Sequence, residues 1–312
     1  MRDTFSLLKD MMRRDTLRNP SKPINSEQFD MNAFLAEEKP QVVWLGHSTS
    51  LIRMNGKTMM TDPVLSNRAS PFPFAGPKRL ISKLSIAVDT LPHIDVVLIS
   101  HNHYDHLDYS TIRKLRHKTT KFFVPLGVAA HLRTWGVRED QIIELDWWDE
   151  ATFEDLTFAC TPSRHFSGRT LTDRFKTLWC SWVIHSEDTQ LFFSGDTGYG
   201  PHFKQIGKKY GPFDVTLMEC GQYNTHWGNI HMMPEQTIMA HQDLKGRHLL
   251  PVHWGAFSLA LHAWTEPIKR VKKAAEAAHV DITTPKLGQV FLIHAKDYPK
   301  STWWEGDTRR EK

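Results

Sequence analysis

The stretch that decides the fold is Val96-Val97-Leu98-Ile99-Ser100-His101-Asn102-His103-Tyr104-Asp105-His106. Its apolar first part predicts a buried strand, and its last six residues contain three imidazoles and one carboxylate. Ligands at positions i, i+2, i+4 and i+5 suit a loop at the end of a strand, where they turn inward to hold two cations. Imidazole and carboxylate are the ligands of hydrolytic zinc, with manganese or iron as substitutes. The stretch therefore predicts a strand that ends in a metal-binding loop.

The composition is that of a globular protein. The chain has 312 residues, 40% of them hydrophobic and 24% charged, enough for one large domain or two average ones. The net charge is +4, and the excess is not gathered into one block, so charge alone gives little support to nucleic-acid binding. A mildly positive surface still suits an anionic substrate or a membrane face.

Cysteines and apolar segments bear on the cellular compartment. Cys160, Cys180 and Cys220 are odd in number and widely spaced, which argues against a disulfide framework and against a cysteine-based zinc site. The N-terminus has no apolar segment of signal-peptide length, and no stretch reaches the ~18 apolar residues that span a bilayer. We therefore expect a cytoplasmic protein without a transmembrane segment, in which peripheral membrane contact stays open.

The element pattern alternates two batches of strands with helices. Strands are predicted at 42–45, 50–54, 57–61, 94–100, 121–125, 142–145, 152–162, 178–185, 190–194, 215–219, 248–252 and 290–294. Asn55-Gly56 predicts a two-residue hairpin turn between the second and third of them. Helices are predicted at 109–116, 127–135, 234–243 and 266–278. Two sheets face to face, with helices on their outer faces, is the architecture that this order favours.

The first 40 residues differ from the rest. Residues 1–18 predict a short helix that packs on the body or lies on a membrane surface, and residues 19–40 carry prolines typical of an extended lead-in. The predicted division is an N-terminal arm and lead-in over 1–40 and a single domain over 41–312.

Five places offer ligands at the end of a predicted strand: Asp62, the 101–106 cluster, His165, Asp196 and His253. A lone histidine after a strand is usually structural, and an aspartate in Gly-Asp-Thr is often a turn former. Their recurrence at strand ends, in a chain that also holds the 101–106 cluster, favours a shared site.

These residues resemble the five-motif pattern of the metallo-β-lactamase superfamily. Within it, the chain is similar to the branch that contains N-acylphosphatidylethanolamine-hydrolysing phospholipase D and its bacterial relatives. The resemblance spans residues 41 to about 270 and lies in segments 44–49, 61–63, 101–106, 164–169, 177–179, 194–199 and 253–255. It implies an α+β fold, the four-layer αβ/βα sandwich.

The resemblance also implies a site with two divalent metal ions, zinc with manganese or iron as alternatives. His101, His103 and His165 would hold the first ion, and Asp105, His106 and His253 the second, while Asp196 would bridge them. Asp62 would brace the cluster loop from behind and orient its ligands. Two such cations share one water, lower its pKa toward neutrality and produce a bridging hydroxide, which gives Asp105 a catalytic position.

Other polar residues near the motifs have more than one interpretation. His231 and His262 flank the last ligand segment, and either would serve to donate a proton to a leaving group or to bind a phosphate oxygen. His47 lies at a strand end and would line the cavity. Arg169 would pair with an anionic group of the substrate or with Asp173. For each of these residues a structural role is the alternative.

Three functions compete. The first is a metal-dependent phosphodiesterase, phospholipase D-like, that acts on a small or lipid-like anionic substrate. The second keeps the metals and opens a lactone, including phosphorylated lactones. The third is a nucleic-acid-processing enzyme or binding protein, for which the sequence shows neither basic runs nor an appended domain. A serine-hydrolase alternative has no support, because the chain has no Gly-x-Ser-x-Gly motif. The oligomeric state is left open.

Overall fold

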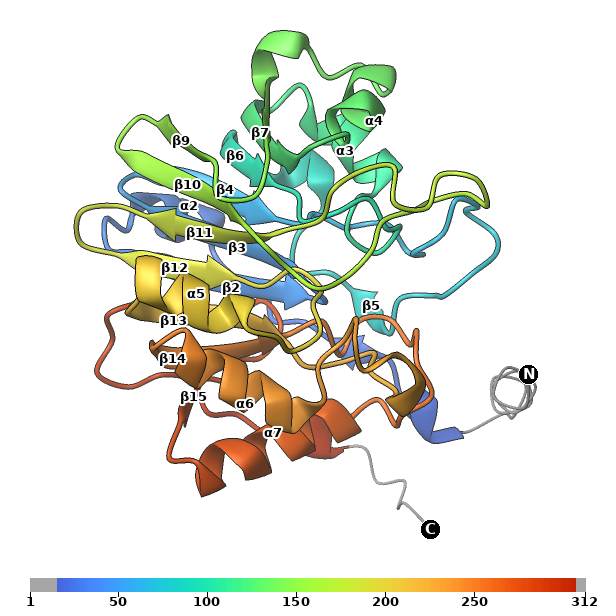
Figure 1. Ribbon diagram of the computed structural model, residues 1–312. Coiled ribbons are helices and arrows are strands. Elements are labelled where there is room, and N and C mark those ends of the chain that lie inside the picture. The colour runs from blue at the N-terminus through green and yellow to red at the C-terminus, as the bar shows by residue number, and fades with distance from the viewer. Residues whose placement is uncertain (1–15, 307–312) are drawn as a thin grey trace.

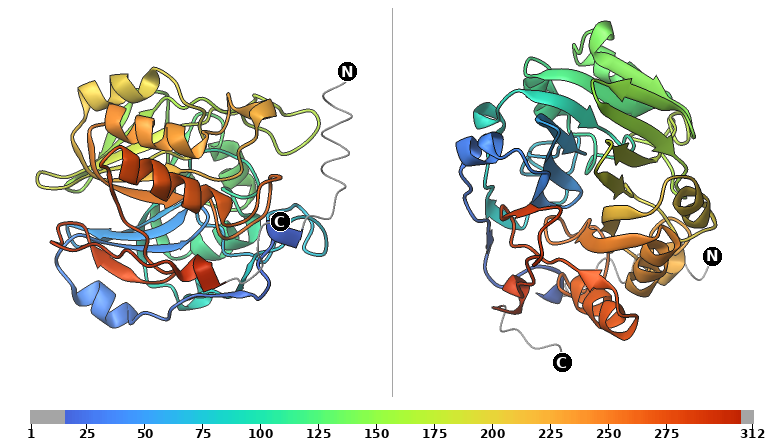
Figure 2. Two further views of the ribbon diagram at one scale, coloured as in Figure 1. Left: turned by 90° about the horizontal axis from the view of Figure 1, so that it is seen from below. Right: turned by 90° about the vertical axis from the view of Figure 1, so that its left-hand side faces the viewer.

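The computed structural model describes residues 16–306. Two seven-stranded sheets lie face to face, with helices on their outer faces (Figures 1 and 2). This arrangement confirms the predicted four-layer α+β sandwich. Each sheet is mixed, with antiparallel pairs on one side and parallel pairs on the other.

The first sheet has the strand order β16-β2-β3-β4-β6-β7-β8. Its strands are β2 (Gln41–Gly46), β3 (Thr49–Met54), β4 (Lys57–Thr61), β6 (Ile94–Leu98), β7 (Thr119–Pro125), β8 (Ile142–Leu145) and β16 (Val290–Leu292). The helices on its outer face are α2 (Met31–Ala36), α3 (Tyr109–Leu115) and α4 (Ala129–Thr134). The Asn55-Gly56 hairpin joins β3 to β4 as predicted, and both residues have positive φ.

The second sheet has the order β15-β14-β13-β12-β11-β10-β9. Its strands are β9 (Glu150–Phe153), β10 (Leu156–Thr161), β11 (Ser181–His185), β12 (Gln190–Phe193), β13 (Phe213–Glu219), β14 (Gly246–Val252) and β15 (Asp281–Ile282). Its outer face is covered by α5 (His202–Lys209), α6 (Pro234–Asp243) and α7 (Glu266–Ala277). A small separate sheet pairs β1 (Ile24–Asn25) with β5 (Ile81–Lys83).

Side-chain alternation along the strands fills two cores. In β6, Val96 and Leu98 belong to the cluster between the sheets, whereas Ile94 and Val97 belong to the cluster beneath α3 and α4. A strand with apolar residues on both faces is buried on both faces, as in parallel sheets. The first sheet therefore holds the end of β6, and the loop that follows it, in a fixed position.

Several details differ from the sequence prediction, among them the short strands β1, β5 and β15, which were not predicted. Helix α2 interrupts the expected extended lead-in, because the Asp30 side chain caps it by accepting the N–H groups of Asn32 and Ala33. Helix α5 was not predicted. The expected strand at 152–162 is two strands joined at Glu154, which has a φ of 56°. The expected strand at 178–185 begins only at Ser181.

The N-terminal segment is partly described. The helix predicted for residues 1–18 lies outside the described residues except for a 3-10 turn at Thr16–Arg18. Ile24 and Phe34 are buried in the two cores, so the lead-in packs on the body. Among residues 16–306, no helix has both the length and the apolar composition needed to cross a bilayer.

Candidate metal site

Strand ends from both sheets meet at one place. The first sheet contributes the turn between β2 and β3, the end of β4 and the loop after β6; the second contributes the loops after β10, β12 and β14 and the end of β13. These segments carry the following residues: His47, Asp62, His101, His103, Asp105, His106, His165, Asp196, Glu219 and His253. The site therefore lies across the two sheets, which explains why its residues are far apart in the sequence.

One group of potential ligands consists of His101, His103, His165 and Asp196, whose ligand atoms lie within 4.8 Å of one another. His103 Nδ1 lies 2.8 Å from His101 Nε2 and 3.2 Å from His165 Nε2. Asp196 Oδ2 lies 3.8 Å from His101 Nε2 and 3.7 Å from His165 Nε2. Four ligands around zinc at ~2.0–2.1 Å are about 3.3 Å apart, so these separations suit one cation.

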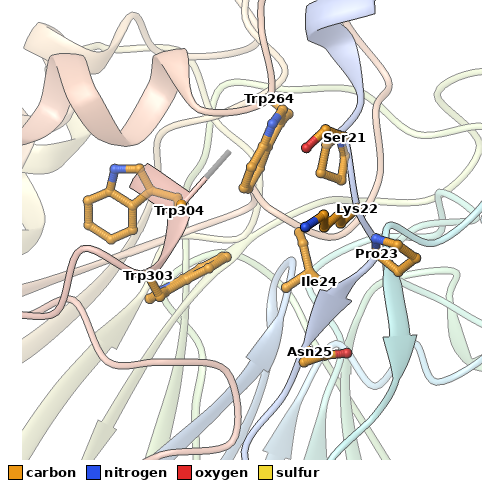
Figure 3. Close-up of a pocket in the computed structure, with 10 residues that line it drawn as sticks. Ser21, Lys22, Pro23, Ile24, Asn25, Trp264, Trp303 and Trp304 are labelled. Carbon is orange, nitrogen blue, oxygen red and sulfur yellow. The ribbon is translucent and has the colours of Figure 1, made fainter. Parts of the chain in front are cut away.

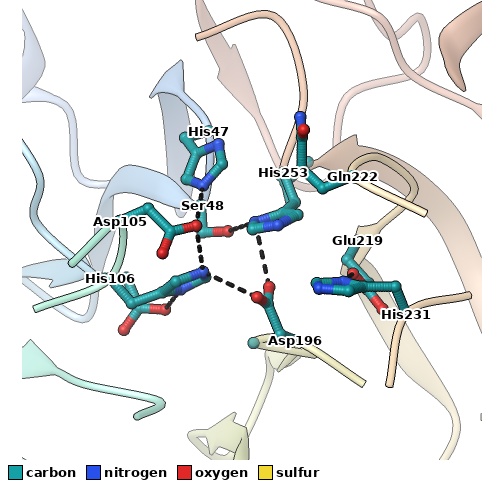
Figure 4. A network of polar contacts seen from close by, with 12 residues as sticks. His47, Ser48, Asp105, His106, Asp196, Glu219, Gln222, His231 and His253 are labelled. Atoms are coloured by element: carbon teal, nitrogen blue, oxygen red, sulfur yellow. Dashed lines mark hydrogen bonds and ion pairs between the residues drawn. The ribbon is translucent and has the colours of Figure 1, made fainter. Parts of the chain in front are cut away.

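A second group lies beside the first. His106 Nε2 is 3.4 Å from Asp105 Oδ2 and 3.1 Å from Asp196 Oδ2. His253 Nδ1 is 3.1 Å from the other oxygen of Asp196, so that carboxylate faces both groups (Figure 4). His47 also joins this group, because its Nε2 lies 2.8 Å from Asp105 Oδ2. The structure thus brings together all seven residues predicted as ligands.

Asp62 lies directly behind the cluster loop. Its Oδ1 accepts the backbone N–H of Ser100 at 2.7 Å, and its Oδ2 lies 2.6 Å from both Ser100 Oγ and His106 Nδ1. The His106 ring therefore donates from Nδ1 to Asp62 and directs Nε2 toward Asp196. Asp62, His47 and His253 have φ values of 33°, 53° and 63°. Such backbone strain is frequent at functional sites.

Several buried polar atoms of the cluster lie close to other ligand atoms but form no well-aligned hydrogen bond among the described residues. They include His106 Nε2, Asp196 Oδ1 and His253 Nε2. A buried polar atom without a partner costs about 1–3 kcal/mol, so groups of them need an explanation. Bound divalent cations would satisfy them, because imidazole nitrogens and carboxylate oxygens are their ligands. The donor set therefore fits a metal centre.

The electrostatics of the cluster point the same way. Burial lowers the pKa of His101, His165 and His253 well below the usual value, and lowers that of His103 to about 4. Their rings are therefore neutral at pH 7, as metal binding requires. For His106, burial acts to lower the pKa, but the neighbouring aspartates raise it well above the usual value. The aspartates thus need a positive charge here, which metal ions would supply.

A cavity of about 310 Å³ opens beside the cluster. Its polar lining comes from the candidate ligands together with Gln222 and His231, and its apolar lining is Phe166, Trp227, Ile230 and Leu259. A mostly apolar cavity with a few convergent polar groups is typical of a small-molecule site.

His231 forms a buried pair with a residue that the sequence prediction missed. Its Nδ1 lies 2.7 Å from Glu219 Oε2 (Figure 4). Burial raises the pKa of Glu219 to about 7. For His231, burial acts to lower the pKa, but Glu219 raises it to about 9. The sequence feature that could have identified Glu219 is its position at the end of the strand Val215-Thr216-Leu217-Met218.

The structure places three further predicted residues away from the cavity or deeper than expected. Arg169 donates to the carbonyls of Asn102 and Leu107, at 2.8 and 2.7 Å, so it holds the cluster loop. The backbone N–H of Arg169, not its guanidinium, contacts Asp173. His262 bonds through both ring nitrogens, to Gln222 N–H and Ala263 O. The His47 ring is buried against Asp105.

A second cavity, of about 280 Å³, lies at the N-terminal segment (Figure 3). It is lined by residues 20–25 and by Trp264, Trp303, Trp304 and Gly306. These lining residues include no carboxylate or imidazole, so the cavity lacks the groups for acid–base or metal chemistry. The chemistry of the molecule is assigned to the His/Asp cluster.

Known protein families and relatives match this chain over most of its length. The family model described as a β-lactamase superfamily domain matches residues 57–254, which include all seven predicted ligands. An uncharacterized protein of Mycobacterium tuberculosis is 49% identical over 252 residues, 80% of this chain and 67% of that protein. N-acyl-phosphatidylethanolamine-hydrolyzing phospholipase D 1 of Caenorhabditis elegans is 33% identical over 275 residues, 83% of this chain and 77% of that enzyme.

Solved structures agree on the fold. Igni18, a metallo hydrolase from the archaeon Ignicoccus hospitalis, matches with a TM-score of 0.59 over 81% of this chain and 97% of its own. At 21% identity, this likeness supports the fold alone.

Proposed function

The chain belongs to the metallo-β-lactamase superfamily and is a metal-dependent hydrolase, and from that premise we propose that it cleaves phosphodiester bonds in a lipid-like substrate. The observation that carries the proposal is the buried His/Asp cluster, with partnerless ligand atoms, beside a cavity that contains a protonatable histidine. The resemblance to an enzyme named phospholipase D favours phosphorus over carbon as the reacting atom.

We assign the residues as the family resemblance implies. His101, His103 and His165 would hold one ion, Asp105, His106 and His253 the other, and Asp196 would contact both. When bound, two divalent ions supply Lewis acidity and a water whose pKa is lowered toward neutrality. Zinc is the ion that we propose, because the ligands are imidazoles and carboxylates at tetrahedral spacing.

The chain's own residues prepare this site. Asp62 fixes the His106 ring, and the Ile230 carbonyl accepts a hydrogen bond from His165 Nδ1 at 2.8 Å. Both contacts leave Nε2 of the histidine directed at the cluster. His231 lies on the cavity wall, where it would donate a proton to the oxygen that leaves. The apolar wall would hold the non-reacting part of the substrate, away from water.

The test is turnover of an aryl phosphodiester by the purified protein before and after metal removal. We expect chelation to abolish turnover and added zinc or manganese to restore it. His231→Ala should keep the metal content and slow the reaction. Turnover that survives complete metal removal would contradict the proposal. A panel of phospholipids and lactones identifies the bond, and faster opening of lactones than of any phosphodiester would assign the second function instead.

A further inference from the structure

Glu219 has a buried carboxylate whose two oxygens accept hydrogen bonds from three N–H groups. The residue is 0% exposed and ends β13. Its Oε1 accepts the backbone N–H groups of Thr197 and Met232, each at 3.0 Å. Its Oε2 faces His231 Nδ1 at 2.7 Å. The carboxylate therefore ties the loop that follows Asp196 to the segment that carries His231.

We propose that Glu219 is a positioning residue for catalysis: it holds the His231 ring and keeps a proton on Nδ1, so that Nε2 is the nitrogen presented to the substrate. This inference rests on the proposed phosphodiesterase function. The two backbone contacts fix the carboxylate, and the fixed carboxylate fixes the ring. Because a carboxylate only accepts hydrogen bonds, the nitrogen that faces it must be the donor.

The reaction then balances without a further reactant. The oxygen of one water forms a bond to phosphorus, and the bond from phosphorus to the alcohol oxygen breaks. That oxygen takes the proton of His231 Nε2, while Nδ1 keeps the second proton, which it donates to Glu219; the proton lost by the attacking water then restores Nε2. Glu219 keeps its contacts throughout, so its role is to orient a proton donor and not to exchange protons with the substrate.

A different role is open to Glu219, because its carboxylate also lies within 4.8 Å of ligand atoms of Asp196, His231 and His253. Three N–H groups already occupy three of the roughly four lone-pair positions of the Glu219 carboxylate. Positioning is therefore favoured over metal binding, and metal content separates the two roles.

Glu219→Gln is the informative variant. The amide oxygen can still accept the two backbone N–H groups, but the NH₂ group then faces His231 Nδ1. Two donors cannot face each other, so Nδ1 loses its proton; the ring that keeps only the Nε2 proton is neutral and is a weaker proton donor. We expect kcat to fall about 10²- to 10⁴-fold, the range of general acid catalysis, with a smaller change in KM and an unchanged metal content.

The matched control is Glu144→Gln. The Glu144 carboxylate also accepts two backbone N–H groups, from Gly127 at 2.7 Å and Ala129 at 3.1 Å, but it has no histidine partner among its described contacts. This variant should keep kcat near the wild-type value. A loss of kcat in both variants would show that amide substitution acts through the fold.

The position of the proton on the His231 ring separates the two roles of Glu219. If Glu219 only stabilised the fold, its substitution would not change which ring nitrogen carries the proton. Long-range ¹H–¹⁵N spectra of the zinc-loaded protein, with the His231 signals assigned by their absence in His231→Ala, should show a proton on Nδ1 in the wild type. Glu219→Gln should show it on Nε2 only. If that variant does not fold, the wild-type spectrum still shows whether Nδ1 of His231 carries a proton, as the proposal requires.

Three results would overturn the inference: an unprotonated Nδ1 in the wild type, full kcat in Glu219→Gln, or the loss of one metal ion from that variant. If the wild type does not hydrolyse phosphodiesters, the proposed function fails, whereas the spectra and the metal content still test whether Glu219 orients His231.

Discussion

Asp196 is the residue on which both ligand groups depend. Its Oδ2 lies within 3.8 Å of ring nitrogens of His101, His106 and His165, and its Oδ1 lies 3.1 Å from His253. It is buried and follows β12 in the second sheet, while two of these partners, His101 and His106, lie in the loop after β6 of the first sheet. A single carboxylate therefore connects the two sheets at the site.

Removing this carboxylate should remove both metal ions. We expect Asp196→Ala, dialysed against metal-free buffer, to retain far less than the ~2 ions per chain expected of a two-metal site, and to lose turnover, because each ion loses an anionic ligand. Elemental analysis of the purified protein measures this. Asp188→Ala, an exposed aspartate beyond β11, is the control and should keep its metal. Full metal content in Asp196→Ala would refute the shared-ligand assignment.

At the residue level, the sequence predicts the convergence of the ligands better than the roles of their neighbours. The ligand types follow from the motifs, and strand ends bring them to one edge. Arg169 could not be assigned, because its partners are backbone carbonyls, which no side-chain pattern reveals. Glu219 was missed because a carboxylate at a strand end is usually exposed. Its burial depends on contacts with Thr197 and Met232, which the sequence does not reveal.

At the level of elements, the longer strands were predictable, whereas the short strands β1, β5 and β15 and the helices α2 and α5 were not. Apolar alternation and the Asn55-Gly56 turn specify β3 and β4 locally. Helix α2 has only six residues and lies between Pro23 and Pro40, which favoured an extended segment. Helix α5 contains Gly207, a weak helix former. The structure explains it: a Cβ at this position would lie 2.1 Å from the Asp243 carbonyl, so α5 packs closely on α6.

The loop after β12 makes a similarly close approach at the site. Gly195 has a φ of +54°, and a Cβ there would lie 2.6 Å from Ser100 Cβ and 2.8 Å from the Cys180 carbonyl. Ser100 in turn contacts Asp62 and His101. We expect Gly195→Ala to lower the free energy of unfolding by about 1–3 kcal/mol and to weaken zinc binding, because the two loops must move apart.

Gly56→Ala provides the comparison. Gly56 has a φ of +73°, but a Cβ there would have no atom within 4 Å. Its cost is the backbone strain alone, about 1–2 kcal/mol, with no effect on zinc affinity. Urea unfolding and zinc titration of both variants measure the two effects. Equal zinc affinity in Gly195→Ala and the wild type would show that the loops do not position the ligands.

The contact between α6 and β13 makes stability depend on pH. His241 of α6 is buried, its Nδ1 lies 2.7 Å from Thr216 Oγ1, and burial lowers its pKa to about 4. Between pH 6.5 and 4 the unfolded chain binds a proton here that the folded chain does not, so this residue's contribution to stability falls as the pH falls.

Unfolding in urea at pH 7 and pH 5, with a chelator present so that metal loss plays no part, tests this dependence. His241→Gln should lose less stability between the two pH values than the wild type does. His117→Gln, at an exposed position, should behave as the wild type. An identical pH dependence in His241→Gln and the wild type would mean that His241 is not the residue responsible.

At the scale of the whole molecule, two loops project from the same side (Figures 1 and 2). They are residues 66–80, with Phe72 and Phe74 exposed, and residues 163–178, with Leu171 and Phe175 exposed. Residues 64–88 contain four basic residues and no acidic one, and of the four Lys78 and Lys83 are exposed while Arg79 is buried. Phe175 contacts Phe166, which lines the cavity, at 6.3 Å between ring centroids. Exposed apolar side chains with basic neighbours favour contact with an anionic lipid surface.

We therefore expect the protein to sediment with vesicles that contain anionic phospholipid, and to do so less as the salt concentration rises. Burying one phenylalanine contributes about 1.5–3 kcal/mol, so Phe72→Ser with Phe74→Ser should lower the partition coefficient at least about tenfold. The same double variant should hydrolyse a soluble aryl phosphodiester at the wild-type rate, because neither side chain lines the cavity.

Met239 is the matched control, since it is a large apolar side chain, 47% exposed, on α6 and outside both loops. Met239→Ser should bind vesicles as the wild type does. If the loops instead joined two copies of the chain, Phe72→Ser with Phe74→Ser would abolish a concentration-dependent dimer and leave vesicle binding unchanged. That outcome, or equal vesicle binding by both variants, would exclude these loops as the lipid contact, while turnover of the soluble substrate would still stand as a test of the metal site alone.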